Sequence, residues 1–158
     1  VSDYILYGKY QDQVKAQETL TYMQPFYDLL KKHQGKMIYI DFWGPWCPPC
    51  LAEMEPLKEL RKKYSTDDIV FISICRNDDR KQYEQVLDKY GMHVDGIEHI
   101  HADDLQAESQ VHKMYNQLNI DGIPYFFIIN REGVIVNYGS MMRPSYPGTA
   151  ECIEEWLK

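Results

Sequence analysis

The sequence predicts one α/β domain in which helices flank a central mixed β-sheet. Three runs of apolar, β-branched and aromatic residues are typical of buried strands, and segments with helical spacing lie between them. Turn residues and a further short strand follow the third run, which predicts that an antiparallel hairpin closes the sheet. A chain of 158 residues is long enough to form one such domain around a sizeable core.

Composition and charge exclude several classes of protein. Hydrophobic residues make up 44% and charged residues 26% of the chain, as in soluble globular domains. The formal net charge of -7 disfavours a nucleic-acid partner, because phosphate groups repel an acidic surface. No apolar stretch reaches the roughly 18 residues that span a bilayer, and the first residues lack a signal-peptide pattern. We therefore expect any membrane anchor to lie outside this chain.

The N-terminal part predicts an arm followed by a helix. Residues 1–17 are polar and poorly periodic, which indicates an irregular arm before a domain that spans residues 18–158. A helix is expected over residues 18–34, because apolar residues recur there at helical spacing, and Gly35 is a typical residue at a helix end. The apolar positions of this helix are Leu20, Met23, Phe26, Tyr27, Leu29 and Leu30.

Strands then alternate with helices. Met37–Trp43 is a nearly continuous apolar run, so we expect both of its faces to be covered, as in parallel sheets. A helix is expected over residues 48–64, and the two prolines at its start are compatible with the first helical positions. Ile69–Cys75 is a second apolar run and predicts a strand, and residues 79–90 predict a helix that ends at Gly91.

The remaining elements complete the predicted sheet. A short strand over Ile97–His101 and a helix over residues 104–118 come first. Tyr125–Ile129 is the third buried strand, and the turn residues 130–133 connect it to an expected hairpin partner at 134–138. A final helix is expected over residues 148–158.

Cys47 and Cys50 form a C-x-x-C motif between the first strand and the helix after it. Unpaired N–H groups and the positive dipole end of a helix stabilise a thiolate at that position. We predict that Cys47 is the exposed nucleophile and that Cys50, one helical turn inward, resolves the mixed disulfide. The alternative is a structural zinc half-site, but no other residues supply two further ligands at a suitable spacing. Neither a metal nor an organic cofactor is therefore expected.

The two prolines between the cysteines predict the direction of the redox reaction. Pro48 and Pro49 lack the N–H groups that could face the Cys47 sulfur, whereas the N–H of Cys50 remains. A less stabilised thiolate favours the disulfide form of the pair. We therefore predict that the pair acts as a reductant rather than an oxidant.

Two carboxylates are candidates for handling the proton of Cys50. Asp41 lies in the first buried strand, where desolvation should raise its pKa and allow it to accept that proton. The alternative for Asp41 is a solvated and idle side chain at a strand edge. Glu53 follows Cys50 by three residues and shares its helical face, although most glutamates on helices are simply solvated.

Other reactive residue types have ordinary explanations. Cys75 and Cys152 are expected to be small buried hydrophobic residues. A polar cluster at the end of the short strand expected over Ile97–His101, and just after it, is expected to be a solvated loop. It lacks the residue spacing of known metal sites. Its members are His99, His101, Asp103 and Asp104.

The run of residues 41–50, DFWGPWCPPC, resembles the active-site strand and loop of the thioredoxin superfamily, including the buried acid and both tryptophans. This resemblance implies the thioredoxin fold over roughly residues 18–158. X–Pro bonds are mostly trans, but the resemblance implies that Pro124 is the family's cis-proline beside the cysteine pair. It also implies that the backbone of Ile123 pairs with an extended substrate, which contacts Trp46, and that Gly139 keeps the docking surface flat.

The segment CLAEM at residues 50–54 is similar to the TlpA/ResA-type branch of the superfamily, which is membrane-associated or periplasmic. In that branch the corresponding glutamate is functional, which favours a role for Glu53. The branch also carries an inserted strand and helix, for which this chain has room between Arg76 and Gln117. A periplasmic or otherwise extracytoplasmic location in a bacterium follows from the same resemblance.

These features predict a thiol–disulfide oxidoreductase that reduces disulfides of extracytoplasmic proteins. Its expected partners are a disulfide-containing protein substrate and an upstream thiol electron donor. One alternative is a peroxiredoxin-like peroxidase, although Gly44 stands where that class has a hydroxyl residue three positions before its cysteine. The other alternative is a non-enzymatic docking module of the same fold. The intact cysteine pair and Asp41 argue against this alternative.

Overall fold

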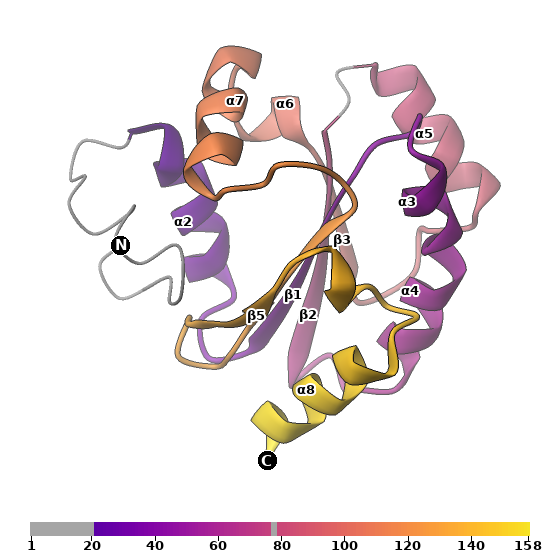
Figure 1. The fold of residues 1–158 in the computed structure, drawn as a ribbon, viewed down its shortest axis with the longest axis vertical. Helices are drawn as coiled ribbons and strands as arrows, with labels where there is room; N and C mark the ends of the chain where they lie inside the picture. Colours follow the sequence, from indigo (N-terminus) through magenta and orange to yellow (C-terminus); the bar gives the residue numbers. More distant parts are fainter. Residues whose placement is uncertain (1–20, 77–78) are drawn as a thin grey trace.

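The structure is a computed structural model that describes residues 21–76 and 79–158 (Figure 1). The predicted arm at residues 1–17 and the start of the first predicted helix lie outside the described residues. The first described elements are the 3₁₀ helix η2 (Thr21–Met23) and α2 (Gln24–Lys32), which continue the expected helical segment.

A five-stranded mixed sheet forms the centre of the described fold, in the order β3-β2-β1-β4-β5. β1 pairs with β2 and β2 with β3 in parallel, whereas β4 pairs antiparallel with both β1 and β5. The α/β prediction with a closing hairpin is confirmed, and four strands have the expected bounds. The strands are β1 (Met37–Trp43), β2 (Ile69–Cys75), β3 (Ile97–His101), β4 (Tyr125–Ile129) and β5 (Ile135–Tyr138).

Helices cover both faces of this sheet (Figure 1). α2 and α7 (Glu108–Gln117) lie on one side, and α3 (Pro48–Ala52), α4 (Met54–Lys62) and α5 (Arg80–Lys89) lie on the other. Among the described residues, no helix is both long enough and apolar enough to cross a bilayer. The remaining helices are α6 (Ala102–Leu105), η3 (Ser140–Met142) and α8 (Pro147–Leu157).

β1 separates two halves of the core. Every residue of this strand is buried, as its continuous apolar sequence predicts. Ile40 and Phe42 pack in the cluster that includes residues of α2 and α7, whereas Tyr39 and Trp43 pack with residues of α4, α5 and α8. Because side chains alternate along a strand, Asp41 shares the face of Tyr39 and Trp43. That face also packs against α4, which follows the cysteine motif.

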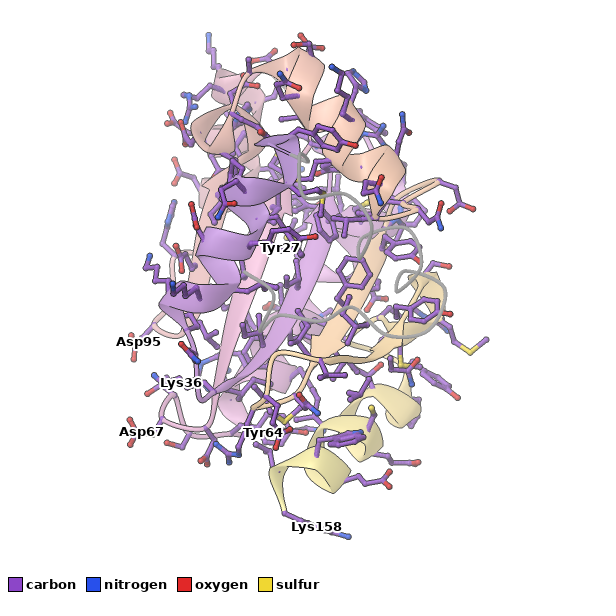
Figure 2. All side chains as sticks on the ribbon, turned by 90° about the vertical axis from the view of Figure 1, so that its left-hand side faces the viewer. Tyr27, Lys36, Tyr64, Asp67, Asp95 and Lys158 are labelled. Atoms are coloured by element: carbon purple, nitrogen blue, oxygen red, sulfur yellow. A yellow bond between two sulfur atoms is a disulfide. The ribbon has the colours of Figure 1, made fainter. Side chains whose placement is uncertain are left out.

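The parallel strands run toward one end of the molecule. Lys36, Asp67 and Asp95 precede β1, β2 and β3, and these three residues lie on the lower left side of the molecule in Figure 2. The carboxyl ends of the strands therefore lie at the opposite end, where loops commonly carry functional residues.

Two segments that were each predicted as one helix are divided into two helices in the structure. The helix expected over residues 48–64 divides into α3 and α4 at Glu53. Pro56 accounts for the break, because it has no N–H to bond the carbonyl four residues earlier and its ring crowds that carbonyl. The helix expected over residues 104–118 divides into α6 and α7, because Gln106 has extended backbone angles and its side chain donates to the Tyr22 carbonyl at 2.8 Å.

The polar cluster near β3 is not a solvated loop. His99 and His101 lie on β3, and His101 is fully buried with its ring against Tyr83 of α5. Asp103 lies in α6, where its N–H donates to His101 Nδ1 at 3.3 Å. Asp104 of the same helix forms a salt bridge that joins α6 to α5, with a distance of 2.7 Å to a guanidinium nitrogen of Arg80. The cluster therefore connects β3, α5 and α6.

Candidate active site

Cys47 and Cys50 form a disulfide at the start of α3. Cys47 is the N-cap residue with extended backbone angles, and the N–H of Cys50 donates to its sulfur at 3.3 Å. Pro48 and Pro49 occupy the first two helical positions, where a missing N–H leaves no intrahelical bond unmade. The sequence thus builds a helix start in which one backbone N–H faces the Cys47 sulfur.

Both cysteines are nearly buried in this disulfide form. Cys47 is 5% exposed and Cys50 is 3% exposed, so the expectation of an exposed Cys47 is not met. The preceding residue, Trp46, is 59% exposed and is the large apolar side chain next to the pair. A loop from a distant part of the chain also faces the Cys47 sulfur.

That facing loop contains Ile123 and Pro124, which precede β4. The peptide bond between these two residues is cis, and the Ile123 carbonyl oxygen lies 3.8 Å from the Cys47 sulfur. A Cβ atom at Gly44 would lie 2.9 Å from the Trp46 ring and 3.2 Å from the Ile123 side chain. Gly44 thus provides the space in which both apolar side chains lie beside the disulfide.

Asp41 is the buried acid on the face of β1 that the cysteine pair covers. It is 7% exposed, and the hydroxyl of Ser73 on β2 donates to its Oδ2 at 3.2 Å. Burial raises the pKa of Asp41 to about 7, the hydrogen bond from Ser73 opposes this rise, and the negative charge of Glu53 adds to it. An acid with a pKa in this range exchanges protons at neutral pH.

Glu53 lies at the junction of α3 and α4, and its carboxylate is held from a distant part of the chain. Ser145 donates its N–H to Glu53 Oε1 at 2.9 Å and its hydroxyl to Oε2 at 2.7 Å. Sequence reasoning did not identify Ser145, because nothing in the local pattern links two residues that are 92 positions apart. The same holds for Ser73, whose contact with Asp41 depends on the pairing of β1 with β2.

Gly139 follows β5 and lies at a backbone conformation that favours glycine, with φ of 112°. Its N–H donates to the carbonyl of Phe126 in β4 at 3.0 Å. Phe126 is the strand partner of Asp41, so Gly139 supports the strand next to the buried acid. Its described contacts do not place it against the cysteine pair.

The other two cysteines differ in burial. Cys75 is buried at the end of β2, as expected, opposite Trp43 and in the same hydrophobic cluster as Cys47 and Cys50. Cys152 on α8 is only partly buried, so the expectation of a buried residue was too strong there. Within residues 21–76 and 79–158, no three His, Cys, Asp or Glu side chains are arranged to hold a metal ion.

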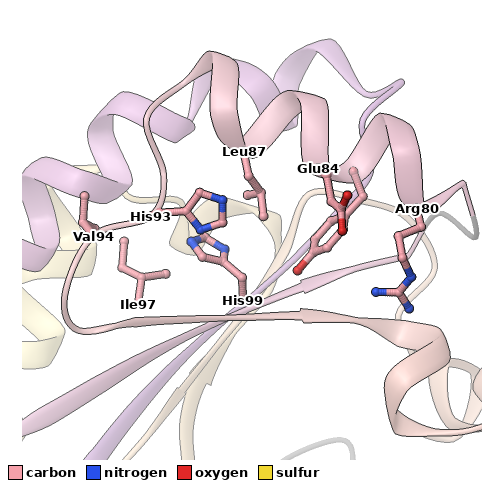
Figure 3. Close-up of a pocket in the computed structure, with 8 residues that line it drawn as sticks. Arg80, Glu84, Leu87, His93, Val94, Ile97 and His99 are labelled. Atoms are coloured by element: carbon pink, nitrogen blue, oxygen red, sulfur yellow. The ribbon is translucent and has the colours of Figure 1, made fainter.

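A separate open pocket of about 520 Å³ lies between α5 and β3 (Figure 3). Its lining includes Leu87, Ile97 and His99, and none of the candidate site residues. Burial lowers the pKa of His99, whose Nε2 donates to the Met92 carbonyl at 2.7 Å. Arg80, which also lines the pocket, forms a salt bridge with Asp104 of α6.

Comparison with known proteins agrees with this arrangement. The family described as Thioredoxin-like matches residues 35–135. The chain belongs to this family. The thioredoxin fold and the thioredoxin-superfamily resemblance of the sequence are thereby confirmed.

Individual relatives extend the match. The solution structure of a Bacteroides vulgatus protein, described as a candidate thiol-disulfide oxidoreductase, is 37% identical with a TM-score of 0.64, covering 81% of this chain and 78% of that one. A crystal structure from the same organism, similarly described, is 31% identical with a TM-score of 0.65, covering 80% of this chain and 82% of that one. These thioredoxin-like relatives therefore share both sequence and fold with the chain.

The curated relatives carry the name thiol-disulfide oxidoreductase ResA. The ResA of Halalkalibacterium halodurans is 26% identical over 134 residues, which are 82% of this chain and 65% of that protein. The chain spans 56% of the ResA of Bacillus anthracis, to which it is 25% identical. It thus covers less than two thirds of the length of these two ResA proteins.

Proposed function

We propose that this protein is a thiol–disulfide oxidoreductase that reduces protein disulfides through Cys47 and Cys50. The observation that carries the proposal is the disulfide at a helix start, with the Cys47 sulfur 3.8 Å from the Ile123 carbonyl. The names of the ResA and Bacteroides relatives support the same activity. A thiolate at such a position is a suitable nucleophile for disulfide exchange.

The proposed cycle begins with the reduced dithiol. The Cys47 thiolate attacks one sulfur of a substrate disulfide, which forms a mixed disulfide and releases the other substrate sulfur as a thiolate. Asp41 takes the proton of Cys50, and the resulting thiolate attacks the Cys47 sulfur. This step closes the Cys47–Cys50 disulfide and releases the second substrate thiolate. An upstream thiol donor then returns two electrons to the pair.

The direction of the reaction follows from the helix start. Cys50 supplies the N–H at 3.3 Å from the Cys47 sulfur, and the two residues between the cysteines are prolines without a donor. A thiolate with few donors is less stabilised than one that faces several, so the pair has a low reduction potential and donates electrons. A potential in the range of strongly oxidising disulfide donors would contradict this direction.

The substrate contacts the surface formed by Trp46, Ile123 and Pro124. Trp46 is exposed, and the Ile123 backbone lies next to the disulfide, where it could pair with an extended segment of the substrate. We place the substrate and the electron donor outside the cytoplasm, because the sequence resembles the membrane-associated or periplasmic TlpA/ResA branch. Fractionation of cells that produce the full-length protein tests this location.

Insulin reduction with dithiothreitol as the electron donor tests the activity directly. The wild-type protein should accelerate reduction, and Cys47→Ser should abolish the acceleration. Cys152→Ser is the matched control, because it removes a partly exposed thiol away from the site and should leave the rate unchanged. Equal rates for the wild type and Cys47→Ser would refute the proposal and favour a docking module.

A trapping experiment identifies the substrate and separates a peroxidase from a reductase. In Cys50→Ser the resolving thiol is absent, so the mixed disulfide on Cys47 should accumulate and carry the substrate with it. A peroxidase would instead consume hydrogen peroxide in the presence of a thiol donor. Peroxide turnover without insulin reduction would contradict the proposed function.

A further inference from the structure

Ser145 binds both oxygens of the Glu53 carboxylate. Its N–H lies 2.9 Å from Oε1 and its hydroxyl lies 2.7 Å from Oε2, so a backbone and a side-chain donor act together. Hydrogen bonds to an ionised acceptor are stronger than those between neutral groups, and two of them fix orientation as well as position. The contact joins the α3–α4 junction to the segment that connects η3 with α8.

Buried hydroxyl groups anchor the segment that carries Ser145 on both sides. The Tyr39 hydroxyl donates to the Met142 carbonyl at 2.6 Å, and the Thr149 hydroxyl donates to the Arg143 carbonyl at 2.7 Å. Tyr39 and Thr149 are both fully buried. Ser145 is therefore presented to Glu53 from a backbone that the core holds in place.

Asp41 lies within reach of the Glu53 charge. Burial, followed by the opposing hydrogen bond from Ser73 and the charge of Glu53, gives Asp41 a pKa of about 7. Among the described residues, Tyr39 of β1 and Tyr115 of α7 also interact with Asp41, and burial raises the pKa of each, which keeps both neutral. Among these groups, Glu53 is the one that brings a charge to the buried acid.

We propose that Ser145 is a positioning residue that fixes Glu53 beside Asp41 and the cysteine pair, so that the Glu53 charge controls when Asp41 releases its proton. This inference rests on the proposed function, in which Asp41 exchanges a proton with Cys50. A negative charge held near Asp41 favours its protonated form in the disulfide state. Asp41 then has a proton ready when the donor splits the disulfide and Cys50 leaves as a thiolate.

The test follows the Asp41 side-chain carboxyl by ¹³C NMR in the oxidised protein as the pH is raised. Ser145→Ala removes the hydroxyl donor and lets the Glu53 carboxylate turn toward water, so the Asp41 midpoint should move to lower pH. Glu53→Gln removes the charge and should move the midpoint further in the same direction. Ser145→Thr keeps the hydroxyl and should retain the wild-type midpoint.

The double variant Ser145→Ala with Glu53→Gln separates positioning from a general structural role. If Ser145 acts through Glu53, the double variant should have the same midpoint as Glu53→Gln alone. An unchanged midpoint in Ser145→Ala, even with a lower melting temperature, would overturn the inference. An equal shift in both backgrounds would also overturn it.

The same proteins separate this inference from the proposed function. Wild-type insulin reduction tests the function, whereas the NMR midpoints test the contact between Ser145 and Glu53. A wild-type protein without reductase activity whose midpoint still moves in Ser145→Ala would refute the function while leaving the electrostatic link intact. Active wild-type protein with an immobile midpoint would refute the positioning role alone.

Discussion

Asp41→Asn should remove a pH-dependent loss of stability from the oxidised protein. The pKa of Asp41 is about 7 in the folded protein, against a usual value of 3.8. The folded state therefore keeps a proton that the unfolded chain has already lost above about pH 4. This contribution to stability is complete below about pH 4 and is lost as the pH rises through about 7.

The magnitude follows from the two pKa values. At about 1.4 kcal/mol per pH unit, the interval between 3.8 and about 7 corresponds to about 4 kcal/mol. The wild-type free energy of unfolding should fall by this amount relative to Asp41→Asn between about pH 4 and about pH 8. Asparagine stays neutral throughout, so any fixed cost of burying its amide is the same at every pH and cancels from the comparison.

Urea unfolding of the oxidised protein, followed by circular dichroism over this pH range, measures the difference. Asp67→Asn is the matched control, because it makes the same chemical change at an exposed residue (Figure 2). The control should follow the wild-type pH dependence. A constant difference between Asp41→Asn and the wild type at all pH values would refute the reasoning.

Three further changes test neighbouring contacts. Ser73→Ala removes the hydrogen bond that lowers the pKa of Asp41, so the ¹³C midpoint of Asp41 should rise above about 7; a lower midpoint would contradict this. Tyr39→Phe leaves the carbonyl that it bonds in η3 without its buried donor and should lower the free energy of urea unfolding by about 1–3 kcal/mol. Gly96→Ala puts a side chain at φ of +90° against the guanidinium of Arg61, and should destabilise by about 1 kcal/mol or more in the same assay. Wild-type stability in either of the last two variants would count against the described contact.

The strands could be predicted from the sequence because their signal is local. Met37–Trp43 and Ile69–Cys75 are apolar runs whose ends coincide with the strand ends in the structure. The helices were less predictable where a distant contact decides the conformation. Gln106 interrupts the helical segment after β3, and its side chain donates a hydrogen bond to the Tyr22 carbonyl. No local sequence pattern predicts this contact. Pro56, by contrast, is a local signal for the break at Glu53. The spacing of apolar residues, taken alone, does not indicate this break.

The candidate site divides in the same way. Spacing and sequence context identified Cys47 and Cys50, and the burial of Asp41 followed from its apolar neighbours in the first strand. The partners of the two carboxylates were not foreseen, because they depend on tertiary structure. Ser73 reaches Asp41 through the register of β1 with β2, and a slip of one residue would turn its side chain to the other face. Ser145 reaches Glu53 only after the segment before α8 has packed.

Asp41 is better explained by chemistry at the cysteine pair than by packing. Single domains are typically stable by about 5–15 kcal/mol, so a buried acid that costs about 4 kcal/mol at neutral pH is a large fraction of that total. Among the described residues, the hydrogen bond from the Ser73 hydroxyl at 3.2 Å does not offset the desolvation that keeps the pKa of Asp41 near 7. A neutral residue of similar size would fold more stably at this position. We therefore predict that the acid exchanges a proton there with the Cys50 thiol, which packs on the same face of the sheet.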